Sequence, residues 1–151
     1  MNKLALIIII LFSNCQNYES PSRLLIAIEQ ISFSKHIEKN EINLKDVYNF
    51  EWELLYIFKE HVEPKDISEI IGFDCECEIV PDGLEMYIFI YNGSIVEKNI
   101  VETTGYDFNI QNYLDLDKSI VINSKNSKFI ILDKKSYYLL EPINNIDNSK
   151  E

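Results

Sequence analysis

Two cysteines separated by one residue, Cys75 and Cys77 in the stretch FDCECEIV, could form a bridge, bind a metal ion or remain free thiols. On an extended strand, residues i and i+2 point to the same face. Their Cα atoms would then lie about 6.5–7 Å apart, at the edge of what a disulfide tolerates. A metal site needs more ligands, and His61 is the nearest candidate because Glu76 and Glu78 would point to the opposite face. We therefore expect buried or half-buried free thiols on a strand, with a strained bridge as the alternative.

Other residues suited to catalysis are sparse, apart from the carboxylates. His36 and His61 are the two histidines, and the sequence contains no G-x-S-x-G, H-E-x-x-H or glycine-rich phosphate motif. The 25 Asp and Glu residues would permit a carboxylate pair for glycosidic chemistry. With four glycines, however, the chain has little loop from which to build a deep cleft. The sequence therefore predicts a protein that is not an enzyme and has no cofactor, and a small hydrolase remains an alternative.

The N-terminal stretch MNKLALIIIILFSNCQN has the layout of an export signal. Lys3 supplies a short positive region, residues 4–12 are uninterrupted apolar residues, and small or polar residues then precede Cys15. A helix needs about 20 apolar residues to cross the hydrocarbon core of a membrane. The apolar run here is about half that long, which is typical of a cleaved signal rather than a spanning helix.

This segment resembles a bacterial lipoprotein signal, in which a four-residue box ends in the cysteine that receives the lipid. The corresponding box is FSNC, with Phe12 where Leu is usual, Asn14 where a small residue is usual, and Cys15 at its end. The resemblance implies that residues 1–14 are a signal peptide and that Cys15, carrying acyl chains such as palmitate, is the mature N-terminus. It also implies a bacterial cell-envelope protein, lipid-anchored on the periplasmic or outer face of a membrane. An ordinary cleaved secretory signal is the alternative.

The chain is strongly acidic, with 25 Asp and Glu against 14 Lys and Arg and a formal net charge of −11. Removal of residues 1–14 takes away only Lys3 among the charged residues, which leaves a net charge of −12. Such a domain is repelled by nucleic acid and by anionic lipid head groups. The charge therefore excludes a nucleic-acid partner and favours a basic protein partner, or simply solubility.

The spacing of apolar residues predicts two helices and a first strand. Apolar residues recur at helical spacing over 22–38, where Pro21 and Ser22 can start a helix. A second helix is expected over 64–71, with a proline at its start and Gly72 at its end. In FEWELLYIF one face is wholly apolar and the other turns apolar midway, which predicts a strand over 50–58 that enters the middle of a sheet.

A hairpin is expected at Asn92-Gly93, because this dipeptide between two apolar runs is the strongest short hairpin signal. The run before it, 84–91, is apolar on both faces and should be a central strand. The other expected segments are a polar tether (15–21), polar connections (40–49 and 104–118, the latter with a short helix at 109–114), further strands (75–80, 94–102, 119–123, 128–133 and 136–142) and a disordered tail (143–151).

These segments together predict a single α+β domain over 22–142. It would contain a mainly antiparallel sheet of five to seven strands, arranged as a meander with its hairpin at 92–93, and one or two helices packed against the sheet.

The order of the segments over 40–110 also resembles small bacterial lipoproteins of uncharacterised function, which show a Trp-acid-x-apolar-Tyr-x-Phe strand, a helix ending in an apolar-Gly pair, and an apolar hairpin. Glu53 stands where Asp is usual in these proteins. The resemblance supplies no activity, and it marks Trp52 and Glu53 either as surface motif positions or as a packing corner and its cap. The matching residues are Trp52, Glu53, Leu55, Tyr56, Phe58, Ile71, Gly72, Phe89, Asn92, Gly93 and Val96.

The functional hypothesis that follows is an acidic protein-binding or inhibitory module, of the immunity type, tethered at the cell envelope through Cys15. Its surface would meet a basic protein partner. The alternatives are a structural or assembly component of the envelope and a small hydrolase.

Overall fold

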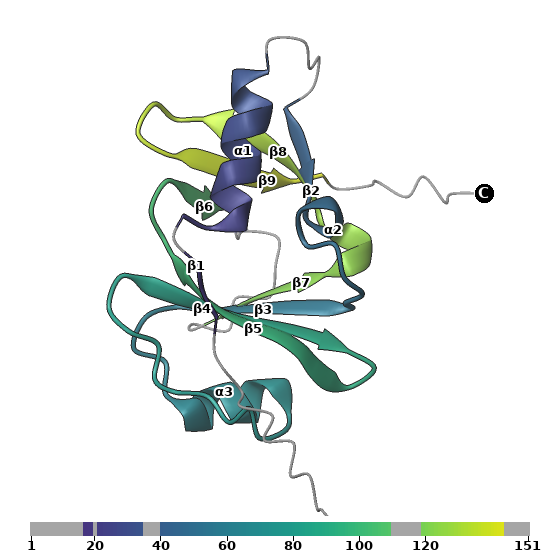
Figure 1. The fold of residues 1–151 in the computed structure, drawn as a ribbon, viewed down its shortest axis with the longest axis vertical. Coiled ribbons are helices and arrows are strands. Elements are labelled where there is room, and N and C mark those ends of the chain that lie inside the picture. Colours follow the sequence, from purple (N-terminus) through teal and green to yellow (C-terminus); the bar gives the residue numbers. More distant parts are fainter. Residues whose placement is uncertain (1–16, 20, 35–39, 110–118, 144–151) are drawn as a thin grey trace, which may run out of the picture.

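The computed structural model describes residues 17–19, 21–34, 40–109 and 119–143, and within them the fold is α+β, as predicted. The strands form two sheets, one of five and one of four strands, where a single sheet was expected. Figure 1 shows the five-stranded sheet crossing the middle of the molecule, with α3 below it and the four-stranded sheet and α1 above it.

The first sheet has the strand order β1-β5-β4-β3-β7, and its neighbouring strands are antiparallel except for the parallel pair β1 and β5. Strand β4 lies at its centre and is covered on both faces, as its two apolar faces predict. Tyr87 and Phe89 face one core cluster, and Met86 and Ile88 face the other. The strands are β1 (Asn17–Glu19), β3 (Leu54–Phe58), β4 (Leu84–Tyr91), β5 (Ser94–Glu102) and β7 (Ser119–Asn123).

The hairpin at 92–93 is confirmed. Strands β4 and β5 pair antiparallel around Asn92 and Gly93, whose φ angles are 50° and 71°. Two successive left-handed residues are what a type I′ turn requires, and Asn and Gly adopt that conformation at the lowest cost.

The second sheet has the order β2-β8-β9-β6, and its strand β6 runs parallel to β9. A single sheet was the wrong expectation because two of these strands are three residues long and lie within segments that look like polar connections. Their pairing depends on partners distant in sequence, such as Tyr106 opposite Tyr138. The strands are β2 (Glu41–Asn43), β6 (Tyr106–Phe108), β8 (Lys128–Asp133) and β9 (Tyr138–Pro142).

Two of the described helices were expected and one was not. Helix α1 (Arg23–Phe33) begins as predicted at Ser22, whose Oγ accepts a hydrogen bond from the Leu25 N–H at 3.0 Å. It ends at its cap Ser34, earlier than the expected end at 38. Helix α3 (Pro64–Ile71) is confirmed, with Gly72 in the left-handed conformation at its end. The short helix α2 (Leu44–Val47) lies within the stretch expected to be a polar connection.

Buried apolar side chains form two clusters, one on each face of the first sheet. The larger lies between the two sheets and beneath α1 and α2, and includes Leu24, Tyr48, Trp52 and Phe89. The smaller lies between the first sheet and α3, and includes Ile67. This arrangement explains why β3 and β4 are apolar on both faces.

Three other expectations are corrected. Residues 17–19 are a strand of the first sheet rather than part of a polar tether, because they pair with Asn99–Val101 of β5. The predicted strand over 50–58 is regular only at 54–58, since the chain bends at 50–53 to enter the sheet. Residues 75–80 follow an irregular path between α3 and β4. Cys15, the signal peptide, most of the helix expected at 109–114 and the tail beyond 143 lie outside the described residues.

Gly105 occupies the turn at which the chain leaves the first sheet for the second. Its φ is +98°, and a Cβ there would lie 2.9 Å from Cδ1 of Leu25 in α1. We expect Gly105→Ala to lower the free energy of unfolding by about 1–3 kcal/mol, because alanine is strained at this φ and must push Leu25 aside. Urea denaturation measures the change. The neighbouring Thr104→Ala, at an exposed position, should change it by less than about 0.5 kcal/mol, and equal effects of the two substitutions would contradict the prediction.

Candidate binding site

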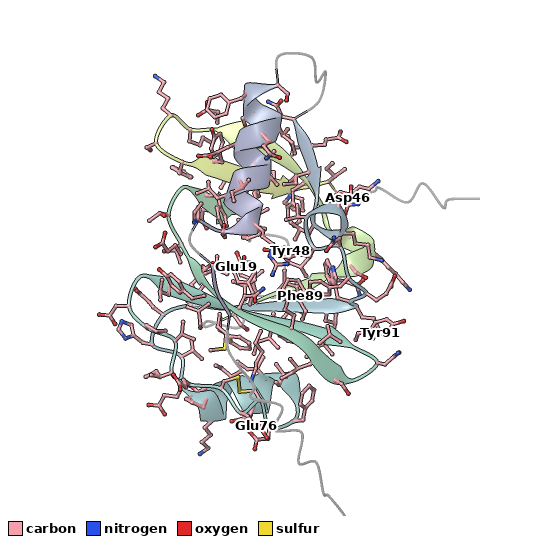
Figure 2. All side chains as sticks on the ribbon, in the orientation of Figure 1. Glu19, Asp46, Tyr48, Glu76, Phe89 and Tyr91 are labelled. Carbon is pink, nitrogen blue, oxygen red and sulfur yellow. A yellow bond between two sulfur atoms is a disulfide. The ribbon has the colours of Figure 1, made fainter. Side chains whose placement is uncertain are left out.

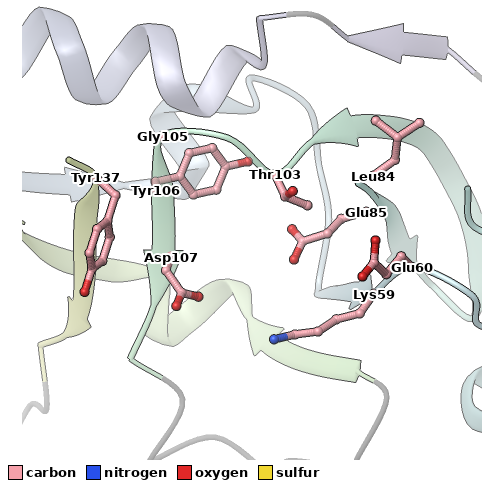
Figure 3. Close-up of a pocket in the computed structure, with 9 residues that line it drawn as sticks. All are labelled: Lys59, Glu60, Leu84, Glu85, Thr103, Gly105, Tyr106, Asp107 and Tyr137. Carbon is pink, nitrogen blue, oxygen red and sulfur yellow. The ribbon is translucent and has the colours of Figure 1, made fainter. Parts of the chain in front are cut away.

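A cavity of about 440 Å³ opens where the first sheet meets the second. Its walls come from the residues after β3, the start of β4, the connection from β5 into β6, and the turn before β9. Figure 3 shows the side chains that line it. They are Lys59, Glu60, Leu84, Glu85, Thr103, Gly105, Tyr106, Asp107 and Tyr137.

The cavity lining is acidic. It holds the three carboxylates of Glu60, Glu85 and Asp107 and the single ammonium of Lys59, which gives −2 when all four are ionised. Figure 3 shows Glu85, Asp107 and Lys59 extending into the same open space. Tyr137, at the rim, is 41% exposed and offers an aromatic face to a ligand. Carboxylates and an aromatic ring are the groups that bind an ammonium or a guanidinium ion.

Glu85 is the half-buried acid of this lining, and its pKa is raised to about 7. Burial is the main cause, and the negative charge of Asp107 adds to it, whereas the ammonium of Lys59 and a hydrogen bond with Tyr87 act in the opposite direction. At neutral pH the Glu85 carboxyl is therefore close to half ionised. A cation entering the cavity would favour its ionised form.

A chain of hydroxyl groups connects Glu85 with the start of α1. The Ser22 hydroxyl donates to the Tyr106 hydroxyl at 3.4 Å, and the Tyr106 and Tyr87 hydroxyls are 3.0 Å apart. Burial raises the pKa of Tyr106 to about 12, and it raises the pKa of Tyr87 well above its usual value. Both phenols are consequently neutral at physiological pH, so Tyr87 can donate a hydrogen bond to the Glu85 carboxylate while Tyr106 bonds to Tyr87 and Ser22.

A second polar cluster ties β1 to α1 and β5. The Arg23 guanidinium binds the Glu19 carboxylate, with Nε 2.6 Å from Oε1, and it also contacts the carboxylate of Glu97. Glu97 also accepts a hydrogen bond from the Asn99 side chain at 2.8 Å. The Arg23 guanidinium carbon lies 5.5 Å from the centre of the Tyr48 ring. Figure 2 shows Glu19 and Tyr48 together between the two sheets.

The residues singled out in the sequence are not part of this cavity. Trp52 is 1% exposed, so its assignment as a surface position is wrong; its ring packs edge-on against Phe89, with centroids 5.7 Å apart. Glu53 is exposed, and its Oε2 accepts a hydrogen bond from the Asn92 N–H at 3.2 Å. The pair is therefore a packing corner and a cap for the hairpin turn. Cys15 lies outside the described residues.

Cys75 and Cys77 form a disulfide with a Cα–Cα distance of 5.2 Å. The expectation of free thiols on a strand was therefore wrong, because the irregular backbone of this segment brings the two Cα atoms closer than a strand would. Among the described residues, no group of three His, Cys, Asp or Glu side chains could hold a metal ion. The imidazole of His61 instead faces Asp82, with Nε2 3.4 Å from Oδ1.

Sequence reasoning did not identify the cavity residues. Glu85 is a single acid at the start of an apolar strand, and Asp107 is a single acid between Tyr106 and Phe108. An acid at such a position, beside residues expected to be buried, was the one available signal. It does not reveal that the two acids share a cavity, because that depends on how the sheets meet.

Comparisons with protein-family models, with curated proteins and with solved structures give no match for this chain. Within the part of the chain that the structure describes, no helix is long and apolar enough to cross a membrane.

Proposed function

We propose that this chain is a lipid-anchored protein of the bacterial cell envelope that binds a basic protein partner, and that the cavity around Glu85 receives a lysine or arginine side chain of that partner. The acidic lining of the cavity is the observation that carries the proposal. The net charge of −11 supports it, because a strongly negative protein attracts a basic partner over long range. An inhibitory or immunity-type role fits such a module.

The anchor in this proposal is Cys15, acylated after removal of residues 1–14. Strand β1 begins at Asn17, so Gln16 alone would separate the acylated residue from the first sheet. The domain would therefore stand close to the membrane surface. Its binding cavity would serve a partner that reaches the envelope, such as an incoming toxin or a basic wall hydrolase.

The test is cross-linking and affinity capture from intact cells with the tagged full chain. The variants are Cys15→Ala and the double variant Glu85→Gln/Asp107→Asn. The matched control is Glu69→Gln/Asp46→Asn, which also replaces one glutamate and one aspartate by their amides, at exposed positions that do not line the cavity. Intact mass and membrane fractionation report the acylation of each form.

We expect the wild type to carry acyl mass and to capture a basic protein. With purified proteins, the double variant Glu85→Gln/Asp107→Asn (the cavity variant) should bind the captured partner at least about tenfold more weakly than the wild type does. The reason is that two charges that face the partner are lost. The surface control should bind within about twofold of the wild type. Binding that is indifferent to salt, or equally weak in the cavity variant and the surface control, would contradict the cavity as the docking site. Equal mass of wild type and Cys15→Ala would contradict the anchor.

A small hydrolase is the second candidate, because a carboxyl with a pKa of about 7 can both release and accept a proton at neutral pH. Release of reducing sugar ends from purified cell-wall glycan by the full chain would support it, provided that Glu85→Gln removes the activity and Glu69→Gln does not. A structural component of the envelope would instead co-isolate with a membrane complex at high salt, whether or not the cavity acids are present.

A further inference from the structure

The disulfide between Cys75 and Cys77 lies on the side of the first sheet opposite to the second sheet. Figure 2 shows it beside α3, close to the labelled Glu76. The bridge closes a ring of three residues in the irregular segment between α3 and β4, and Glu76 at the middle of the ring has a φ of +48°. This ring is remote from the cavity around Glu85 and has no part in the proposed binding function.

The two sulfur-bearing residues differ in exposure. Cys75 is 2% exposed and belongs to the core cluster beneath α3, whereas Cys77 is half-buried. The Cys75 N–H donates to the Ser68 Oγ at 3.2 Å, which fixes the inner half of the ring on α3. A thiol arriving from solvent can therefore reach the Cys77 sulfur more readily than the Cys75 sulfur.

A buried cation lies against the ring. Lys98 of β5 is 9% exposed, and its Nζ donates to the carbonyl oxygens of Cys75 and Glu76 at 3.0 and 3.1 Å. The ammonium therefore binds two consecutive residues of the three-residue ring. A positive charge beside a cysteine favours its thiolate over its thiol, and the thiolate of lower pKa is the better leaving group in disulfide exchange.

An open cavity of about 310 Å³ adjoins the same residues. It is lined by Cys75, Glu76 and Lys98 together with the hairpin after β4 and the residues preceding the ring. Its walls include Phe73 and Ile95. The ring is thus bordered by open space on its Cys75 and Glu76 side, whereas Cys77 is not among the residues that line this cavity.

We propose that the Cys75–Cys77 ring is a thiol–disulfide exchange site that oxidises a dithiol. One thiolate of the dithiol attacks Sγ of Cys77, a mixed disulfide forms, and the bond to Sγ of Cys75 breaks. Cys75, whose carbonyl oxygen accepts a hydrogen bond from the Lys98 ammonium, leaves as a thiolate. The second thiolate of the dithiol then attacks the first sulfur of the same dithiol, which is bonded to Sγ of Cys77. This attack releases the Cys77 thiolate. The dithiol loses two electrons and becomes a disulfide, the ring gains those electrons, and the two protons of the dithiol end on Cys75 and Cys77.

The first experiment locates the mixed disulfide. It uses the full chain with Cys15→Ala, which leaves Cys75 and Cys77 as its only cysteines. The protein is treated briefly with β-mercaptoethanol, a neutral monothiol that has no second thiol with which to resolve the mixed disulfide intramolecularly, and is then quenched with iodoacetamide and digested. Fragment masses should place the mercaptoethanol adduct on Cys77 and the alkyl group on Cys75. An adduct on Cys75, or alkylation of both residues before any reductant is added, would overturn the proposal.

The second experiment tests Lys98 through the rate of ring reduction by dithiothreitol, followed by alkylation and intact mass. We expect Lys98→Met to slow reduction at least tenfold and Lys98→Arg, which keeps the positive charge, to restore most of the rate. Equal rates for the parent and Lys98→Met would overturn the role of Lys98, and the adduct position tests the ring independently of how well that variant folds.

Discussion

Between pH 4.5 and pH 8, the free energy of unfolding of Glu85→Gln is expected to rise relative to that of the wild type by an amount on the order of 2–3 kcal/mol. The pKa of Glu85 is about 7 in the folded protein, against 4.5 for an ordinary glutamate. Between these two values the folded state binds more protons than the unfolded state, so the stability of the wild type falls as the pH rises. Glutamine stays neutral and can still accept the hydrogen bond from Tyr87, so the variant does not lose this stability. Urea denaturation at several pH values measures both curves.

Glu69→Gln provides the control, because Glu69 is an exposed acid on α3. Its pH curve should run parallel to that of the wild type. Parallel curves for Glu85→Gln and the wild type would contradict a raised pKa at Glu85 and would weaken the case for the cavity. The predicted result would mean that the fold retains an acid that destabilises it at neutral pH. Such a residue is a mark of a functional site, because an amide would serve stability better.

Phe89→Ala is expected to lower the free energy of unfolding by about 3–5 kcal/mol. The Phe89 ring is fully buried and lies 4.7, 5.0 and 5.7 Å, between centroids, from the rings of Tyr48, Phe50 and Trp52. Its removal leaves a cavity whose walls come from the first sheet and from the chain leading into it. Those walls cannot collapse without moving β4, the central strand. Urea denaturation at one pH is sufficient to measure the loss.

The matched control is Phe33→Ala, which removes the same ring from a position that is 77% exposed at the end of α1. It should change stability by less than about 0.5 kcal/mol. If the two substitutions cost the same, the aromatic cluster around Phe89 is not the centre of the core.

Local sequence signals predicted the elements that depend on neighbouring residues. Ser22 and Gly72 mark helix ends because a capping hydroxyl and a left-handed glycine act within a few residues. The hairpin at Asn92-Gly93 was predictable for the same reason. The apolar residues on both faces of 84–91 also predicted a strand covered on both sides, since each face of a strand can be read directly from every second residue.

The division into two sheets was not predictable in this way. Strands β1, β2 and β6 have three residues each, too few to show a period, and their partners lie far along the chain. The cavity has the same origin, because Glu85 and Asp107 meet only through the junction of the sheets. The bridge between Cys75 and Cys77 was only the alternative to free thiols, because the expectation of a strand set the distance between the two Cα atoms at too large a value.

The parallel pairing of β1 with β5 has a mechanical consequence if Cys15 is the anchor. A pull from the membrane would enter the fold at the N-terminal end of β1, whereas a partner in the cavity would pull near the C-terminal end of β5, beside Thr103 and Gly105. Two parallel strands pulled from opposite ends are loaded in shear, so their hydrogen bonds share the force instead of opening one after another. The ion pairs of Arg23 with Glu19 and with Glu97 would also hold β1 against β5 under this load. A strand of three residues could thus transmit tension from a captured partner to the membrane without the domain coming apart.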